Sequence, residues 1–149
     1  MYKEWGPICW IFLHTIVEKL KENHFNLKKE LLFEFIENIC YNLPCPICTK
    51  HAISYLKLNK IRKCNTINDL RLFVFTFHNI VNKRLNKQLY KIEDLEKYKR
   101  CKFPELIKRF TLVFKKPYLF TKVMDGWKRQ KISDNIIKKL KNNIAYFNP

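Results

Sequence analysis

Two cysteines separated by two residues, Cys45 and Cys48, lie in the stretch NLPCPICTKHAISYL, and His51 follows three residues later. Such a pair is typical of a haem attachment site, a zinc site or a redox-active disulfide. Haem attachment needs a histidine directly after the second cysteine, and Thr49 occupies that position, which excludes this option. Metal binding and redox chemistry both remain open.

A structural zinc site needs four ligands, which usually come as two pairs. Cys45, Cys48 and His51 could supply three of them, with Cys64 or His78 as the fourth. The chain has no second C-x-x-C pair and no H-x3-H pair, which weakens this interpretation. It stays as the alternative: a non-enzymatic, zinc-stabilised basic module that binds nucleic acid or an acidic partner.

In the redox interpretation, the cysteine pair begins the first turn of a helix that starts near Pro44. The positive end of the helix dipole favours a thiolate there, and a thiolate is the species that attacks a disulfide or a flavin. A thioredoxin-like site would follow a strand, and no segment of this chain shows strand-like alternation. The residues therefore indicate a redox-capable pair on a helical frame.

Side chains that could hold a flavin recur at helical spacing elsewhere in the chain. Trp10 and His14 share one helix face, and His78 and Asn82 share a face on another helix. The polar ridge of that second helix also carries Asn79, Lys83 and Lys87. Aromatic surface suits an adenine ring, and amide and ammonium groups suit a pyrophosphate.

Helical periodicity dominates the first half of the chain. Pro7 suits the first position of one helix, and residues 27–43 predict a second helix that ends before Pro44. A third helix begins there and carries the cysteine pair. The fourth opens with the capping-box pattern of Thr66 and Asp69 and can run to about residue 87.

A further short helical stretch begins near Ile92, and the amino-acid composition changes after about Cys101. The region 101–149 is strongly basic, and Ser133 could cap a last helix. The apolar face of that helix would consist of Ile136, Ile137, Leu140 and Ile144. We therefore predict an all-α protein: a four-helix bundle over residues 1–100 with a fifth short helix, and a basic helical extension over 101–149 that can pack on the same domain.

Composition narrows the class of protein further. With 149 residues and 15% aromatics, the chain can form an ordered domain without disulfide staples. Its two glycines argue against a sandwich, a barrel or a glycine-rich phosphate loop, so side chains would have to hold any nucleotide. The formal charge of +17 suggests an acidic partner, although scattered, solvated lysines explain it equally well.

Targeting signals are not evident. The first apolar stretch, ICWIFLHTIV, is short and contains His14, and no run approaches the roughly 20 apolar residues that span a bilayer. We therefore expect a protein without a signal or transit peptide, in the cytoplasm or in a virion. Structural disulfides are uncommon in such a reducing compartment, so six cysteines point to chemistry or metal binding before structural disulfides.

Three sequence blocks together resemble the Erv/ALR family of FAD-dependent sulfhydryl oxidases. WGPICWIFLH is similar to the family's W-G-x-x-x-W-x-x-L-H, CPICTKHAISYL to its C-x-x-C-x-x-H-x-x-x-Y-L, and FHNIVNKRLNK to its H-N-x-V-N-x-x-L-x-K. The blocks follow the family order over about residues 5–87. The short chain is most similar to the small members encoded by large DNA viruses.

The resemblance implies an FAD among the four helices and a Cys45–Cys48 disulfide beside its isoalloxazine ring. Cys45 would exchange with the substrate dithiol, and Cys48 would pass two electrons to FAD. The reduced flavin would give them to O2, with H2O2 as product. The activity would serve disulfide formation in virion proteins. The site residues implied in this way are Gly6, Trp10, His14, Cys48, His51, Tyr55, His78, Asn79, Val81, Asn82, Lys83 and Lys87.

The chain also departs from the family pattern. Phe75 and Ile92 stand where many members carry a stapling disulfide, and a second, shuttle C-x-x-C is missing. Electrons would therefore arrive from other thiol proteins, such as a thioredoxin-like carrier. The resemblance further implies a homodimer, and the basic C-terminal region is a candidate contact for nucleic acid.

Overall fold

The computed structural model describes residues 2–118 and 123–149, and the named elements within these ranges are all helical. With η marking a 3₁₀-helix, they are α1 (Tyr2–Lys19), η1 (Glu22–His24), α2 (Phe25–Cys40), α3 (Pro46–Leu58), η2 (Ile61–Lys63), α4 (Ile67–Arg84), η3 (Ile92–Arg100), α5 (Phe103–Phe114), α6 (Val123–Asn142) and η4 (Ile144–Tyr146). The all-α prediction is confirmed, and η3 begins at the predicted fifth helix.

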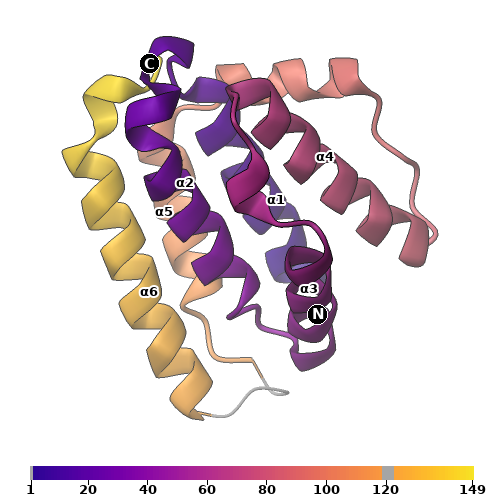
Figure 1. Cartoon of the computed structure of the whole chain (residues 1–149). Helices are drawn as coiled ribbons and strands as arrows, with labels where there is room; N and C mark the ends of the chain where they lie inside the picture. The colour runs from indigo at the N-terminus through magenta and orange to yellow at the C-terminus, as the bar shows by residue number, and fades with distance from the viewer. Residues whose placement is uncertain (1, 119–122) are drawn as a thin grey trace.

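Helix α1 lies at the centre of the molecule and contacts α2, α4, α5 and η3 (Figure 1). From Trp5 to its end only Pro7 is exposed, which is typical of a helix surrounded by other elements. The helix begins at Tyr2, so the prediction that it starts at Pro7 is wrong. Proline there removes only one backbone hydrogen bond near the helix end, while buried Trp5 packs on Tyr2 with ring centroids 5.0 Å apart.

Helices α2 and α4 end earlier than the sequence indicates. The side-chain amide of Asn42 donates to the Asn38 carbonyl at 2.8 Å and closes α2 after Cys40. Helix α4 ends at Arg84, because Asn86 adopts a positive φ of 54° that a helix cannot continue through.

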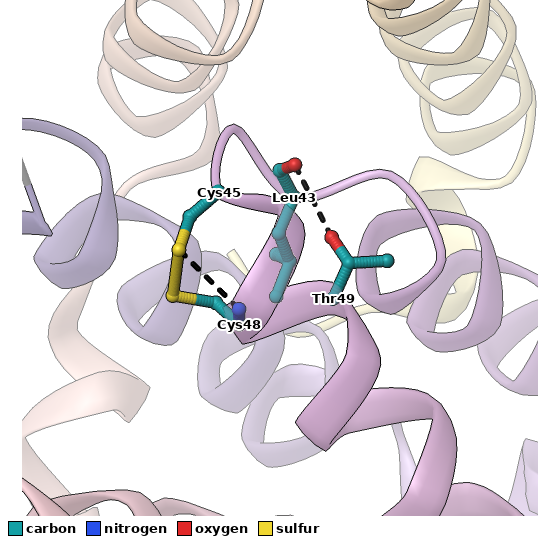
Figure 2. Close-up of a disulfide and its surroundings, with 4 residues drawn as sticks. All are labelled: Leu43, Cys45, Cys48 and Thr49. Atoms are coloured by element: carbon teal, nitrogen blue, oxygen red, sulfur yellow. Dashed lines mark hydrogen bonds between the residues drawn. A yellow bond between two sulfur atoms is a disulfide. The ribbon is translucent and has the colours of Figure 1, made fainter. Parts of the chain in front are cut away.

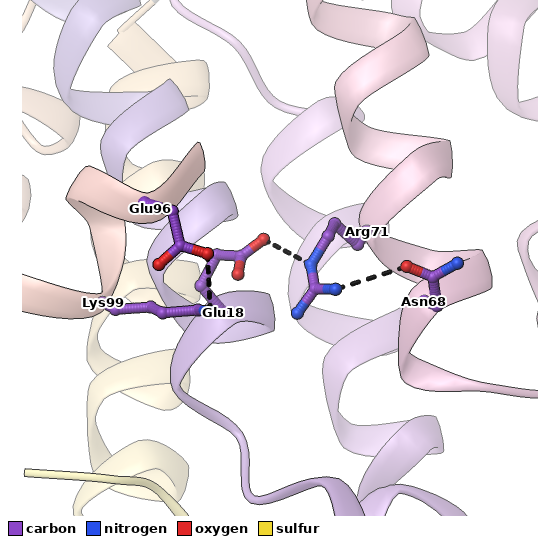
Figure 3. Close-up of polar contacts among 5 residues, drawn as sticks. All are labelled: Glu18, Asn68, Arg71, Glu96 and Lys99. Atoms are coloured by element: carbon purple, nitrogen blue, oxygen red, sulfur yellow. Dashed lines mark hydrogen bonds and ion pairs between the residues drawn. The ribbon is translucent and has the colours of Figure 1, made fainter. Parts of the chain in front are cut away.

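The predicted capping box at the start of α4 is confirmed. Asp69 N–H donates to Thr66 Oγ1 at 3.0 Å, and Thr66 N–H donates to Asp69 Oδ2 at 3.1 Å. Two residues further along the same helix, Arg71 Nε donates to Glu18 Oε1 of α1 at 2.7 Å, and Arg71 Nη1 donates to Asn68 Oδ1 (Figure 3). The Glu18 side chain is 2% exposed, so this ion pair fixes α4 against α1 in a largely dry contact.

The C-terminal helices share the hydrophobic core of the first four. Phe110 of α5 stacks on Phe12 of α1 with centroids 4.3 Å apart, and Ile136 and Leu140 of α6 belong to the same buried cluster. Helix α6 contacts α2 and α5 along the outside of the molecule (Figure 1).

The predicted start of the last helix is wrong. Ser133 is fully buried in the middle of α6 rather than at its N-terminus. Helix α6 already includes the ten residues before Ser133. Arg129, which is also buried, holds them in place because it donates to the carbonyls of Phe114 at 3.0 Å and Lys116 at 3.2 Å. Ile144 lies beyond the end of α6 and is 44% exposed, so it does not belong to the apolar face. No helix in the described ranges has both the length and the apolar character to cross a membrane.

Candidate active site

Cys45 and Cys48 form a disulfide at the start of α3, with their Cα atoms 5.2 Å apart (Figure 2). Cys45 is the N-cap of the helix and Pro46 is its first residue, where a fixed φ and a missing N–H are tolerated. The Cys48 N–H donates to Cys45 Sγ at 3.3 Å, and Thr49 Oγ1 donates to the Leu43 carbonyl at 3.3 Å. The local sequence thus holds both sulfurs at the positive end of a helix, which stabilises a thiolate.

The two sulfurs face different surroundings. Cys48 lines a cavity of about 160 Å³ with mostly apolar walls, which we call the disulfide cavity. Its lining residues are Tyr2, Trp5, Cys9, Trp10, Leu13, Cys40, Leu43, Ile47, Cys48, His51, Phe77, Val81, Arg84 and Leu85. Cys45 is not among them; it is buried, with 7% of its surface exposed, whereas Cys48 is only partly buried.

A second cavity, of about 540 Å³, adjoins the first, and we call it the basic cavity. Its lining residues are Tyr2, Pro7, Trp10, Ile11, His78, Asn82, Lys87, Gln88, Tyr90, Lys97, Tyr98, Cys101 and Arg109. Tyr2 and Trp10 line both cavities, and Trp10 Nε1 donates to the Tyr2 hydroxyl at 2.6 Å. These two side chains therefore form the boundary between the apolar disulfide cavity and the basic cavity, which is lined by three cations.

Two histidines lie beneath this boundary in a stack of rings. His78 stacks on Trp10 with centroids 4.1 Å apart, and His14 stacks on Tyr98 at 4.6 Å. His14 Nε2 and His78 Nδ1 share a hydrogen bond of 2.9 Å. Burial lowers the pKa of His14 to about 3 and that of His78 to about 4, and Lys97 adds to both shifts. Both rings are therefore neutral at pH 7, and one donates while the other accepts.

Seven of the site residues implied by the sequence line one cavity or the other. Trp10, Cys48, His51 and Val81 line the disulfide cavity, and Trp10, His78, Asn82 and Lys87 line the basic cavity. The structure thus brings together residues from α1, α3 and α4 and from the loop that follows α4.

The other five lie outside both linings. Asn79 holds the following loop, because its side chain donates to the Tyr90 carbonyl at 3.0 Å and accepts from the Tyr90 N–H at 2.8 Å. Tyr55 donates to the Phe73 carbonyl at 2.9 Å and stacks on Phe77, which lines the disulfide cavity. Lys83 is exposed.

His14 and Gly6 complete this group, and each supports a lining residue. His14 lies behind His78, as described above. A Cβ on Gly6 would come within 2.4 Å of the Tyr2 ring, so glycine is needed for Tyr2 to pack where it does.

Several lining residues were not predicted. Trp5, Cys9 and Leu13 follow one another at four-residue spacing on α1, and this periodicity could have indicated a shared face. Burial raises the pKa of Cys40 to about 12 and also raises that of Cys9, so both stay thiols in the cavity wall. Cys40 and Arg109 come from other elements, and no local pattern connects them to the cysteine pair.

The two cavities fit the two halves of FAD. The apolar disulfide cavity suits the isoalloxazine ring, and the basic cavity suits the adenine nucleotide and its diphosphate. Trp5 lines the disulfide cavity and is 2% exposed, yet its Nε1–H finds no acceptor among residues 2–118 and 123–149. A buried donor of this kind matches a ligand with ring nitrogen and oxygen acceptors.

The five candidate ligands of the zinc interpretation do not form a metal-binding cluster. Within the described part of the chain, no group of three or more His, Cys, Asp or Glu residues could hold a metal ion. Cys45 and Cys48 are joined to each other instead.

Comparison with known proteins supports a flavin-dependent thiol oxidase. The model of the Erv1 / Alr family matches residues 8–102, and the chain belongs to this family. A FAD-linked sulfhydryl oxidase of African swine fever virus (isolate Tick/Malawi/Lil 20-1/1983) is 38% identical over 85 residues, which cover 57% of this chain and 71% of the relative. Protein 096R of Invertebrate iridescent virus 3 is 35% identical over 86 residues, or 57% of this chain and 58% of the relative. No solved structure matches the chain.

Proposed function

We propose that the protein is an FAD-linked sulfhydryl oxidase that forms disulfide bonds in thiol-containing proteins. The observation that carries this proposal is the Cys45–Cys48 disulfide, whose Cys48 faces an apolar cavity that adjoins a basic one. Membership of the Erv1 / Alr family supports it. The viral origin of the relatives supports substrates among the proteins of virus particles.

FAD would be held by Trp10, Cys48, His51 and Val81 around its ring system and by His78, Asn82 and Lys87 around its nucleotide half. When bound, it supplies the acceptor for the two electrons of a dithiol and passes them to O2, which becomes H2O2.

The chain's own residues carry out the thiol exchange. A substrate thiolate attacks Cys45 Sγ, the Cys45–Cys48 bond breaks, and Cys48 leaves as a thiolate inside the disulfide cavity. The second thiolate of the substrate then attacks the substrate sulfur that is bonded to Cys45. The substrate leaves as a disulfide, and Cys45 is released as a thiolate. The Cys48 N–H and the start of α3 stabilise that thiolate.

Oxygen uptake with a reduced dithiol substrate tests the proposal. We expect the wild-type chain to consume oxygen, and both Cys45→Ser and Cys48→Ser to lose this activity, because each removes one sulfur of the exchanging pair. Cys64→Ser is the matched control, since Cys64 lines neither cavity and has no disulfide partner. Undiminished uptake by Cys48→Ser would show that the electrons take another route.

A further inference from the structure

Helix α5 lies beyond the part of the chain that matches the family, yet it reaches the basic cavity. The family match ends at residue 102, and α5 spans Phe103–Phe114. Arg109 of this helix lines the basic cavity together with Pro7 and Ile11 of α1. The C-terminal region thus contributes a cation to a cavity whose other lining residues, apart from Tyr2 and Pro7, lie in the family-matched part.

The orientation of α5 is fixed by its buried face. Phe103, Leu106, Phe110 and Phe114 follow at spacings of three or four residues and are all buried. The stack of Phe110 on Phe12 anchors this face to α1, which itself carries Trp10. Because Arg109 directly precedes Phe110, its position beside the basic cavity follows from packing on α1 and does not depend on a free loop.

The charges around the cavity are all of one sign. Lys87, Lys97 and Arg109 come from three separate elements, and no aspartate or glutamate belongs to the lining. Lys97 Nζ already donates to the Tyr90 hydroxyl at 3.1 Å, and Lys87 Nζ lies 4.6 Å from the Tyr2 ring centroid.

Arg109 differs from these lysines. Among residues 2–118 and 123–149, no hydrogen bond or ion pair engages its guanidinium group. A guanidinium presents parallel N–H donors that match two oxygens of a phosphate. Its donors are therefore available for a ligand in the cavity.

We propose that Arg109 binds the diphosphate of FAD, so that α5 completes the cofactor site of this protein. This inference rests on the proposed function, and it assigns a role to part of the C-terminal region. A cation from α5 in contact with the diphosphate also links retention of the cofactor to the docking of α5 on α1.

Flavin binding to the full-length chain, freed of bound flavin, tests this inference without measuring activity. The quenching of flavin fluorescence gives the dissociation constant of FAD and, separately, of riboflavin, which lacks the diphosphate. We expect Arg109→Gln to weaken FAD binding about 10- to 100-fold and to leave riboflavin binding within about twofold. Arg109→Lys should recover part of the loss, because it keeps the charge and removes the fork.

Lys108→Ala is the matched control, since Lys108 is an exposed neighbour on the same helix and lines neither cavity. It should bind FAD as the wild-type chain does. The inference is overturned if Arg109→Gln binds FAD as tightly as wild type, or if it weakens riboflavin as much as FAD. A wild-type chain that binds neither flavin would overturn the proposed function itself.

Discussion

His14 and His78 lie beside Trp10, at the boundary between the two cavities. Their shared hydrogen bond of 2.9 Å requires one ring nitrogen to donate and the other to accept. Burial lowers both pKa values, and the ammonium groups of Lys97 and Lys87 lie near His78. A proton added to either ring would place two N–H groups against each other or a charge in a dry, already positive region.

The stability of the flavin-free chain should therefore fall in acid. In the unfolded chain both histidines take up protons near the ordinary pKa of 6.5, whereas in the folded chain they do so only near pH 4 and pH 3. The unfolding free energy is then fully present above pH 6.5 and decreases below it, by up to about 1.4 kcal/mol per pH unit for each histidine. Urea unfolding between pH 4.5 and 7.5 measures this slope.

The variant His78→Asn separates the histidines from the carboxylates that also titrate in acid. It should show a shallower loss of stability below pH 6.5 than the wild-type chain. Identical pH profiles for the two proteins would contradict the assignment.

Residues that act through local spacing could be predicted from the sequence, and residues that act through packing could not. Cys45, Cys48 and His51 follow one another at three-residue spacing, so their spacing alone indicated chemistry. Arg109 meets the basic cavity only because α5 packs on α1. Asn79 shows the same limit, because its side chain holds the Tyr90 backbone and lines neither cavity.

At the scale of elements, α5 shows how packing on α1 positions the site. Its aromatic face is buried against the central helix, while Leu112 on the same helix is 67% exposed. The helix therefore depends on one face for its attachment.

Replacing Phe110 with alanine should lower the unfolding free energy by about 3–5 kcal/mol, because a fully buried ring is removed and a cavity remains. Leu112→Ala is the control on the solvent side and should change stability by less than about 0.5 kcal/mol. Denaturant unfolding of both variants measures the difference. Equal effects would mean that α5 is not held by this face.

Element boundaries show why some helix signals were reliable and others were not. The Thr66 and Asp69 pattern marked a true helix start, because both reciprocal hydrogen bonds form at the surface. Ser133 offered the start of a similar pattern, but Arg129 tethers the preceding residues to the end of α5 as helix. The signal at Ser133 cannot reveal the contact that Arg129 makes with a carbonyl at the end of α5.

At the scale of the whole molecule, one core extends from α1 to α6, and both cavities border it. The C-terminal region therefore packs on α1, which carries His14, and on α2. Much of the +17 charge lies on the exposed faces, including the outer face of α6 with Lys128, Lys131, Lys138 and Lys141. Nucleic-acid binding through this region stays a prediction.

In the proposed function, the reduced Cys45–Cys48 pair passes two electrons to a flavin held in the disulfide cavity and becomes a disulfide again. The most direct test is the visible absorption spectrum of the purified chain during an anaerobic titration with dithiothreitol. We expect a flavin spectrum that bleaches in the wild-type chain and persists in Cys48→Ser, which lacks the sulfur that lines the cavity. A colourless protein, or bleaching that is as complete in Cys48→Ser as in wild type, would contradict the claim.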